Sequence, residues 1–596
     1  MAEPAQTKAQ ALLHDVGLPK AWRQQHVWRI LDTRFDTLRF LSVWLAWQAD
    51  AQRPRLLHYV ALTDQPPDAR ALLQSAAPDP ELSPLAQELA AHCFGLLPGF
   101  HRVSLQQGQV LLTLCVGAAH AMLRELQFAA DTIFLAPSDA WDGWALKSLA
   151  RCSRRGTVLT VRSAATELQQ GLAQCGFDMR ATRGEFNPRW ELKTTREPLR
   201  THAATPTTCA VIGAGLAGTS VAAALARRGW QVQVLDAAPT PAAGASGLPA
   251  GLVVPHVSVD DSPRSRLSRA GVRLTLQQAH SLLKAGADWD ASGVLEHRVD
   301  GSPGLPHEWP KAGEDWSRAT TDRIHGSPWG QGMRANIPTL WHAQAAWIKP
   351  ARLVQAWLAQ PGVRFVGNAA VAALRKDADE WLLLDAAGQT LARARHVVLA
   401  NAYGALQLLN DLKNGIPELR AGLACLPALR GVRGVVSCGL RSAGDATGMP
   451  PFPVNGLGSL IPAVPVNDGL AWYAGATYDA VDQTAAPDKT HHQTNFEKLR
   501  KLLPAAAQAL GPVFTAGRVQ AWTGTRCVSA DRLPLAGALQ SGDAPSLWIS
   551  TAMGSRGLSF SVLCAELLAA RMGAEPLPIE ASLARSLLPR RAAGHA

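Results

Sequence analysis

The residues with the most specific chemistry form a glycine-rich turn and an acid that follows it. Gly213, Gly215 and Gly218 are spaced as G-x-G-x-x-G directly after the apolar run 209–212, and Asp236 ends the next apolar run. In such a turn the first glycine permits a tight bend, the second lets the backbone approach a pyrophosphate, and the third lets a helix pack on a strand. Asp236 would accept hydrogen bonds from ribose hydroxyls. The order of strand, turn, helix, strand and acid predicts a dinucleotide site.

A second glycine-rich turn lies near the end of the chain. The run 547–551 predicts a strand, Gly-Ser-Arg-Gly follows at 554–557, and a helical pattern extends over 558–572. The N-terminus of such a helix can stabilise negative charge on a reduced flavin, an arrangement for which a nicotinamide enzyme has no need. We therefore expect FAD as the cofactor. The alternative interpretation of this turn is an ordinary strand–helix connection without a ligand.

These segments together resemble the FAD-dependent amine oxidoreductases of the D-amino-acid oxidase and glycine oxidase type. Among them, the chain is most similar to the MnmC family of bifunctional proteins that modify the wobble uridine of tRNA, and the resemblance extends over residues 22–590. The segments that carry it are the turn 213–218 with Asp236, Gly-Ala-Ser-Gly at 244–247 with Ala250 and Gly251, Trp-Ile-Lys-Pro at 347–350, and the runs 523–537 and 552–558.

The resemblance implies a reaction for the FAD module. The module would remove the carboxymethyl group from a 5-carboxymethylaminomethyl side chain of the wobble uridine and leave an aminomethyl group. Hydride would leave the carbon between nitrogen and carboxylate, and water would hydrolyse the imine to release glyoxylate. Arg526 matches the glycine-oxidase position that holds the substrate carboxylate, which a planar guanidinium can do bidentately. The alternative for Arg526 is a structural ion pair with Asp531, and no general base is assigned.

The resemblance also implies which residues contact the cofactor. Arg556 would contact the flavin or shape the second turn. The full set of expected cofactor-binding residues is Gly213, Gly215, Gly218, Asp236, Ser246, Gly251, Gly554, Ser555, Arg556, Gly557 and Leu558. No metal site is expected, because the nine cysteines include no C-x-x-C pair and no Cys/His cluster.

The first module of the family is an S-adenosylmethionine-dependent methyltransferase that methylates the uncovered amine. Its glycine-rich loop corresponds here to Asp-Thr-Arg-Phe-Asp-Thr-Leu-Arg-Phe-Leu at 32–41, where Arg34 and Asp36 replace glycines and side chains occupy space that the cofactor needs. Further family acids are replaced near Thr63, where Asp64 is the only nearby substitute, at Ala118, and at 135–137, where Asp139 or Asp142 could substitute. We expect methylation to be lost and S-adenosylmethionine binding to be in doubt. A fully bifunctional enzyme is the alternative.

The predicted fold class is α/β with two modules. A Rossmann-like methyltransferase-type domain is expected over 1–185, a polar linker with several prolines over 186–207, and an FAD-binding Rossmann domain over 208–596. An α+β substrate domain is expected as insertions at roughly 260–350 and 415–525 of the second module.

Composition limits the class of protein. The chain has 596 residues, of which 47% are hydrophobic, so a mostly disordered protein is excluded. No apolar run of about 18 residues and no signal peptide is visible, which predicts a cytoplasmic protein without a membrane span. The net charge of +11 is spread over both modules, with local excess at 151–155, 193–200 and 585–591.

The expected partner is tRNA, mainly because of the family resemblance, since phosphate contacts explain the spread positive charge only weakly. Trp341 and Trp347 are candidates to stack a flipped-out uridine, with a place in the core as the alternative. The sequence does not indicate the oligomeric state. Two other functions remain open: an oxidase of free glycine or D-amino acids, and a tRNA-binding protein in which FAD is only structural.

Overall fold

The computed structural model describes residues 11, 13–136, 141–161, 165–191, 204–415, 423, 426–442, 448–480, 489–540 and 545–591. The chain divides into two compact units. The first contains Met1–Thr205 and Ala569–Arg585, and the second contains most of the remainder, including Pro206–Ser541 and Pro545–Leu568. The sequence had suggested a single second module from 208 to the end, so the assignment of Ala569–Arg585 to the first unit is new.

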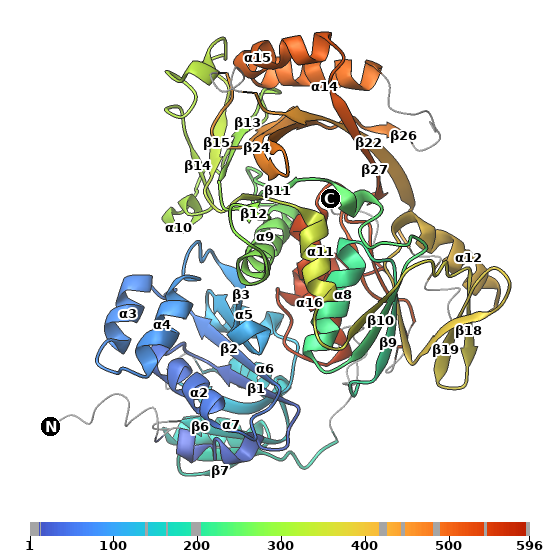
Figure 1. The fold of residues 1–596 in the computed structure, drawn as a ribbon. Coiled ribbons are helices and arrows are strands. Elements are labelled where there is room, and N and C mark those ends of the chain that lie inside the picture. Colours follow the sequence, from blue (N-terminus) through green and yellow to red (C-terminus); the bar gives the residue numbers. More distant parts are fainter. Residues whose placement is uncertain are drawn as a thin grey trace. The chain divides into compact units, whose positions relative to one another are not determined.

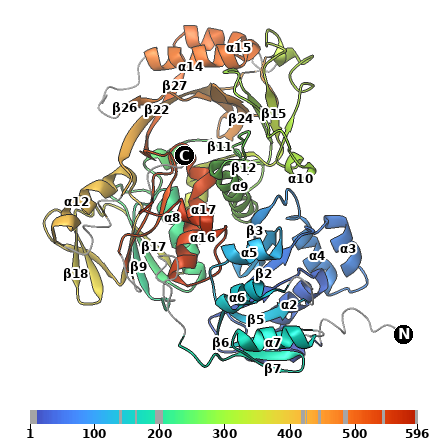
Figure 2. The ribbon, with the colours of Figure 1, turned by 180° about the vertical axis from the view of Figure 1, so that it is seen from behind.

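The first unit is built on an eight-stranded sheet in the order β3-β4-β2-β1-β5-β6-β8-β7 (Figures 1 and 2). Its central strands β4, β2, β1, β5 and β6 are parallel, and β3, β8 and β7 join antiparallel at the two edges. The strands are β1 (Val27–Asp32), β2 (Leu56–Thr63), β3 (Gly99–Leu105), β4 (Val110–Val116), β5 (Ala130–Leu135), β6 (Ser153–Val161), β7 (Phe177–Arg180) and β8 (Arg183–Phe186).

Helices cover both faces of this sheet, because successive side chains of a strand point to opposite sides. Ile30 of β1 packs in one core cluster with side chains of the first three helices below, and Leu31 packs in a second cluster with those of the other three. The helices are α2 (Thr37–Ala49), α3 (Ala69–Ala76), α4 (Leu82–Ala90), α5 (Ala119–Glu125), α6 (Gly143–Arg151) and α7 (Thr166–Gln174). The expected linker begins inside β8, and residues 192–203 of it lie outside the described part.

Buried polar groups explain why Ala569–Arg585 belongs to the first unit. Arg29 donates to the carbonyl of Gly573 at 3.2 Å, and Arg102, which is almost fully buried, donates to the carbonyl of Pro576 at 2.7 Å. His58 lies 3.2 Å from the carboxylate of Glu575, and both side chains are buried. The segment therefore supplies acceptors to cationic groups that the first unit buries.

The second unit contains a six-stranded sheet in the order β17-β10-β9-β21-β29-β28, in which only β28 is antiparallel. Helices α8 and α11 pack together beside β9, β10 and β17, and α12 lies with the β18–β20 sheet on a separate core cluster (Figure 1). The elements are β9 (Thr208–Ile212), α8 (Leu216–Arg227), β10 (Gln231–Leu235), α11 (Pro350–Leu358), β17 (Val363–Val366), β18 (Ala373–Asp377), β19 (Glu380–Leu384), β20 (Thr390–Ala394), β21 (His396–Leu399), α12 (Ala405–Gly415), β28 (Leu535–Ala538), β29 (Leu547–Thr551) and α16 (Gly557–Met572).

A nine-stranded sheet forms the other part of the second unit, in the order β14-β15-β13-β23-β24-β25-β22-β26, with β27 paired to β22. Helix α14 packs against β22, β24 and β25 and also against α15, as Figure 1 shows. The elements are β13 (Val294–His297), β14 (Ser317–Ala319), β15 (Thr339–His342), β22 (Leu429–Leu440), β23 (Val454–Gly456), β24 (Gly458–Val466), β25 (Gly469–Gly475), β26 (Asp479–Ala480), α14 (Lys489–Leu502), α15 (Pro504–Thr515) and β27 (Gln520–Ser529).

Smaller elements link the two sheets: β11 (Gly251–Val253), β16 (Ala346–Ile348) and β12 (Trp289–Asp290) form a three-stranded sheet, and α9 (Pro263–Leu282) follows β11. The predicted α/β class with a substrate sheet added to the FAD-binding part is confirmed. Among the described residues, none of the helices has the length and apolar character needed to cross a membrane. The same residues hold no cluster of three metal-ligating side chains.

Candidate active site

The three glycines of the first turn lie where a side chain would not fit. Gly213 has a φ of +108°, and a Cβ there would lie 2.7 Å from the carbonyl oxygen of Ala400. At Gly218, on the first turn of α8, a Cβ would lie 1.9 Å from the carbonyl oxygen of Gly213. A Cβ at Gly215 would meet the hydroxyl of Ser246 at 3.0 Å. The turn therefore presents bare backbone at the N-terminus of α8, where N–H groups can bind phosphate.

Asp236 and Ser246 hold this turn in place. The Asp236 carboxylate accepts hydrogen bonds from the backbone N–H of Ala214 at 2.7 Å and of Ala238 at 2.9 Å. The Ser246 hydroxyl accepts from the N–H of Leu216, the first residue of α8, at 2.9 Å. Both side chains thus shape the backbone around the expected dinucleotide. Their direct contacts to FAD stay a prediction.

The second glycine-rich turn, which follows β29, faces the same space as the first turn, which follows β9. It connects β29 to α16, and both Ala552 and Gly554 have positive φ, at +61° and +58°. For Ala552 this is the strained left-handed region. The Gly554 N–H donates to the carbonyl of Cys527 on β27 at 2.9 Å, so the turn is fixed to the substrate sheet. Leu558 lies against Gly251, where a Cβ would be 2.9 Å from it.

Both turns open into one large cavity of about 1320 Å³. Ligand pockets usually measure roughly 300–1,000 Å³, so the volume suffices for a dinucleotide together with part of a second molecule. Every residue predicted for the site lines it except Gly218, which packs between strand and helix: Gly213, Gly215, Asp236, Ser246, Gly251, Arg526, Gly554, Ser555, Arg556, Gly557 and Leu558. The lining fits FAD, because the glycine-rich turns and the N-termini of α8 and α16 border the cavity and a Cβ at Gly213 or Gly218 would collide with backbone.

Arg526 lies on β27, and no ion pair joins it to an acidic side chain in the described part of the chain. Its guanidinium carbon lies 4.7 Å from the centre of the Tyr478 ring, and its Nη1 is buried without a hydrogen-bond partner among the described residues. Beside it on β22 is Gly434, where a Cβ would lie 2.6 Å from Nη1. The alternative pairing with Asp531 is wrong, because Asp531 binds Arg591 at 2.6 and 2.7 Å. A buried donor without a partner is costly, so Arg526 is prepared for an anion.

Several cavity residues did not emerge from the sequence. Glu296, on β13, lines the cavity. Tyr478 and Lys498 line it too, and the Lys498 ammonium lies 5.5 Å from the centre of the Tyr478 ring. The available signal for Glu296 was a carboxylate directly after the apolar pair Val294 and Leu295. Although burial alone would raise it, the pKa of Glu296 is lowered to about 2 by the hydrogen bond from His342 and the charge of Arg298.

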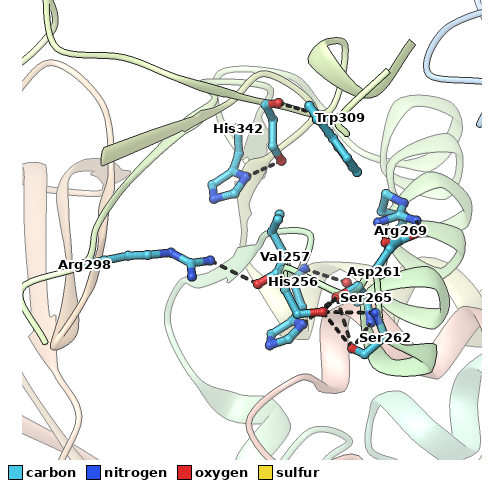
Figure 3. A network of polar contacts seen from close by, with 12 residues as sticks. His256, Val257, Asp261, Ser262, Ser265, Arg269, Arg298, Trp309 and His342 are labelled. Carbon is cyan, nitrogen blue, oxygen red and sulfur yellow. Dashed lines mark hydrogen bonds and ion pairs between the residues drawn. The ribbon is translucent and has the colours of Figure 1, made fainter. Parts of the chain in front are cut away.

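His256 also lines the cavity, and it contacts a group of hydrogen-bonded serine hydroxyls that Figure 3 shows. Its Nδ1 lies 3.0 Å from the Ser265 hydroxyl, which also contacts Ser258 and Ser262. Burial, together with the charge of Arg556, lowers the pKa of His256 to about 4. The imidazole is therefore neutral at pH 7, and the network around it carries no net charge of its own.

This low pKa predicts a pH effect on stability. The unfolded chain binds a proton at His256 below about pH 6.5, whereas the folded chain resists it until pH 4, so stability falls between these values as pH decreases. Between pH 7 and pH 5 the free energy of unfolding of His256→Gln should therefore fall by about 1 kcal/mol less than that of the wild type. This figure allows for the partial exposure of His256. Urea unfolding at pH 7 and at pH 5 measures these free energies. The control is His307→Gln, at an exposed position, which should lose as much stability as the wild type. If His256→Gln also loses as much stability as the wild type, the prediction is wrong.

The corresponding region of the first unit is closed by its own side chains. Asp32, at the end of β1, is fully buried and accepts from the Tyr59 hydroxyl at 2.6 Å, and Arg39 lies 3.2 Å from it. Burial raises the pKa of Asp32 to about 6 although Arg39 opposes this. The turn after β1 is hydrogen-bonded to neighbouring strands. The N–H of Thr33 donates to the carbonyl of Phe134 at 3.0 Å, and the N–H of Phe35 donates to the carbonyl of Leu62 at 2.7 Å.

Within this turn the N–H groups of Thr33, Arg34 and Phe35 are therefore bonded inside the first unit. Asp36, one of the two residues in place of glycine, caps α2 by accepting from the N–H of Arg39 at 2.8 Å. Asp142 likewise caps α6, accepting from Ala145 N–H at 2.8 Å, and Asp139 lies outside the described residues. Two of the acids considered from the sequence, Asp36 and Asp142, thus serve as helix caps here.

Comparison with known proteins defines the class. Residues 208–571, more than half of the chain, match the family model of FAD dependent oxidoreductases, and residues 80–196 match that of an S-adenosyl-L-methionine-dependent methyltransferase. The second unit also shares the fold of glycine oxidase from Bacillus cereus, with a TM-score of 0.50 and 20% identity over 65% of this chain and 99% of that one. The site described above is that of an FAD-dependent oxidoreductase.

Similarity over the whole length defines the family. The chain is 52% identical to the tRNA 5-methylaminomethyl-2-thiouridine biosynthesis bifunctional protein MnmC of Albidiferax ferrireducens, covering 98% of this chain and 96% of that protein. It is 48% identical to the protein of the same name from Polaromonas naphthalenivorans, covering 98% and 93%. The chain belongs to the MnmC family. The expected resemblance, fold class and FAD cofactor are thereby confirmed.

Proposed function

We propose that this chain oxidatively removes the carboxymethyl group from the 5-carboxymethylaminomethyl side chain of a tRNA wobble uridine, with or without 2-thiolation, and leaves the 5-aminomethyl form. The observation that carries this proposal is the buried Nη1 of Arg526, which has no hydrogen-bond partner among the described residues and belongs to a side chain that lines the cavity. The relatives named for the biosynthesis of 5-methylaminomethyl-2-thiouridine in tRNA supply the substrate class.

The residues would act by positioning. The turn at Gly213 and Gly215 and the N-terminus of α8 would hold the FAD pyrophosphate, and the N-terminus of α16 would face the flavin end. Bound FAD would supply the hydride acceptor. Arg526 would hold the substrate carboxylate bidentately, which fixes the adjacent carbon whose hydride is lost. Water would then add to the C=N carbon, and C–N cleavage would release glyoxylate and the primary amine.

An anaerobic experiment tests this proposal. The purified yellow protein is mixed with tRNA that carries the carboxymethylaminomethyl group, and flavin absorbance is followed. We expect bleaching with this tRNA and none with free glycine at the same concentration. Bleaching by glycine alone would favour the second candidate, a small-molecule glycine or D-amino-acid oxidase. No bleaching with either would favour a tRNA-binding protein with structural FAD.

Methylation of the product is proposed to be lost in this chain. The turn after β1 directs its N–H groups to neighbouring strands, and the buried group of Asp32, Arg39 and Tyr59 occupies the strand ends. The match to the methyltransferase model begins at residue 80, after this turn. The competing candidate is a fully bifunctional enzyme, as the relatives are named.

A direct assay separates these candidates. With labelled S-adenosylmethionine and aminomethyl tRNA, we expect no methyl transfer and no saturable binding of the methyl donor at about 1 mM, since affinity weaker than about −4 kcal/mol is undetectable there. A bifunctional relative assayed on the same tRNA is the positive control. Methyl transfer at a rate similar to that control would overturn the proposed loss.

The tRNA surface and the cytoplasmic location are also proposals. The described arginines in the basic run 151–155 are engaged internally: Arg154 pairs with Asp131, and Arg155 donates to the carbonyl of Trp190. Residues 193–200 lie outside the described part. Trp341 and Trp347 are buried, at 8% and 4% exposure, so they belong to the core rather than to a stacking site. Tyr478, which is 62% exposed at the cavity, is the better candidate to stack a base.

A further inference from the structure

The charged groups of the cavity are unevenly divided. Its described lining contains the cations of Arg298, Lys498, Arg526 and Arg556 but only two carboxylates, Asp236 and Glu296. Asp236 accepts backbone hydrogen bonds with both oxygens at the first glycine-rich turn. Among the described lining residues, Glu296 is therefore the one carboxylate on the substrate side of the cavity.

Glu296 is held by one oxygen and leaves the other available. Its Oε2 accepts from His342 Nε2 at 2.9 Å and from Arg298 at 3.4 Å. His342 is buried and oriented by the Ser317 hydroxyl, 2.7 Å from Nδ1, while Arg298 also donates to the carbonyl of Val257 at 3.0 Å (Figure 3). Oε1 has no hydrogen-bond partner within the described chain, and 19% of the side chain remains exposed. Because Glu296 lines the cavity and Oε2 is already bonded, Oε1 is the oxygen available to a ligand there.

Glu296 on β13 and Arg526 on β27 both line this cavity. Arg526 is stacked on Tyr478, with 4.7 Å between the guanidinium carbon and the ring centre. The proposed substrate carries both a carboxylate and an amine N–H, and the cavity offers a guanidinium for the first and a carboxylate oxygen for the second.

We propose that Oε1 of Glu296 accepts the N–H of the substrate's secondary amine and stabilises the positive charge that develops on nitrogen during oxidation. This inference rests on the proposed function. In the step, the C–H bond next to the carboxylate breaks and its electron pair leaves as hydride to the flavin. The nitrogen lone pair forms the C=N bond, so nitrogen becomes cationic. A fixed carboxylate stabilises that charge more than the neutral ground state, which lowers the barrier.

The inference distinguishes Glu296 from a general base. With its pKa held at about 2, Glu296 stays ionised at neutral pH and does not retain a proton taken from the amine. Its contribution is orientation and charge. Loss of the carboxylate should therefore lower the limiting rate of flavin reduction, and substrate affinity should also fall.

The test uses Glu296→Gln, which keeps the size and the acceptor for His342. The matched control is Asp300→Asn, which removes one negative charge from the same segment at an exposed position outside the cavity. Two anticodon stem-loops serve as probes, one with the carboxymethylaminomethyl group and one with oxygen in place of the N–H, which is not oxidised. FAD content, visible spectrum and melting temperature are recorded for each variant.

We expect Glu296→Gln to bind FAD normally and to reduce about 100-fold more slowly with the amine probe, in line with the loss of one preorganised charge. Wild type and Asp300→Asn should bind the amine probe about tenfold more tightly than the ether probe, and Glu296→Gln should bind both alike. A wild-type rate and unchanged discrimination in Glu296→Gln would overturn the inference. If wild type itself fails to oxidise the amine probe, the proposed function fails instead. If Glu296→Gln loses FAD, Glu296→Asp must restore both FAD and discrimination, and failure to restore discrimination also overturns the inference.

Discussion

Arg526→Met should reduce kcat/KM for the carboxymethylaminomethyl tRNA by about 1,000-fold while FAD remains bound. Two charge-assisted hydrogen bonds to a carboxylate contribute roughly 1.5–3 kcal/mol each, and each 1.4 kcal/mol corresponds to a factor of ten. Nη1 has no hydrogen-bond partner among the described residues, so the substitution removes no hydrogen bond of that nitrogen there. Arg526→Lys should recover only part of the loss, since an ammonium does not bind a carboxylate bidentately.

Two further variants make this prediction specific. Gly434→Ala places a methyl group 2.6 Å from Nη1 of Arg526 and should displace the guanidinium. It should therefore lower kcat/KM, but by less than Arg526→Met does. Arg430→Met removes an exposed arginine from the same strand β22 and should keep wild-type kinetics. Stopped-flow flavin reduction measures all four proteins. Wild-type reduction by Arg526→Met would remove Arg526 from the mechanism.

Gly218→Val should yield a protein that is purified without FAD. Even a single Cβ at this position lies 1.9 Å from the carbonyl oxygen of Gly213, so the first turn or α8 must shift. Overpacking of this kind costs about 1–3 kcal/mol, and its displacement of the phosphate-binding backbone should weaken FAD binding at least about 100-fold. Flavin absorbance per chain and titration of the apoprotein with FAD measure the change.

Gly511→Ala is the matched control for this prediction. Gly511 lies in α15, where a Cβ meets only the Phe496 ring at 4.0 Å. This variant should retain FAD and full stability, because alanine favours the helix. A yellow Gly218→Val protein with wild-type affinity would mean that the turn does not hold the dinucleotide.

The glycine-rich turns could be predicted from sequence because their requirement is local. Gly213, Gly215 and Gly218 are spaced by the geometry of one turn and the first turn of one helix, and a short apolar run on each side suffices to place them. The same holds for the second turn before α16. Such signals lie within one short continuous segment, so they can be recognised without knowledge of the tertiary structure.

The states of individual charged groups could not be predicted in this way. Whether Arg526 is free depends on Arg591, which binds Asp531 from 60 residues further along the chain. Glu296 depends on His342, which antiparallel pairing of β13 with β15 brings next to it. Ala569–Arg585 joined the first unit for a similar reason, because buried cations more than 400 residues earlier needed acceptors. These are partnerships of tertiary structure, and spacing in the sequence carries no record of them.

The most direct measurement is mass spectrometry of the wobble nucleoside after incubation of carboxymethylaminomethyl tRNA with this protein and oxygen, with and without S-adenosylmethionine. We expect complete conversion to the aminomethyl nucleoside in both reactions, with equal masses. A methylaminomethyl nucleoside in the reaction with S-adenosylmethionine would contradict the loss of methylation. An unchanged carboxymethylaminomethyl nucleoside in both reactions would contradict the central claim that the cavity around Arg526 oxidises this side chain.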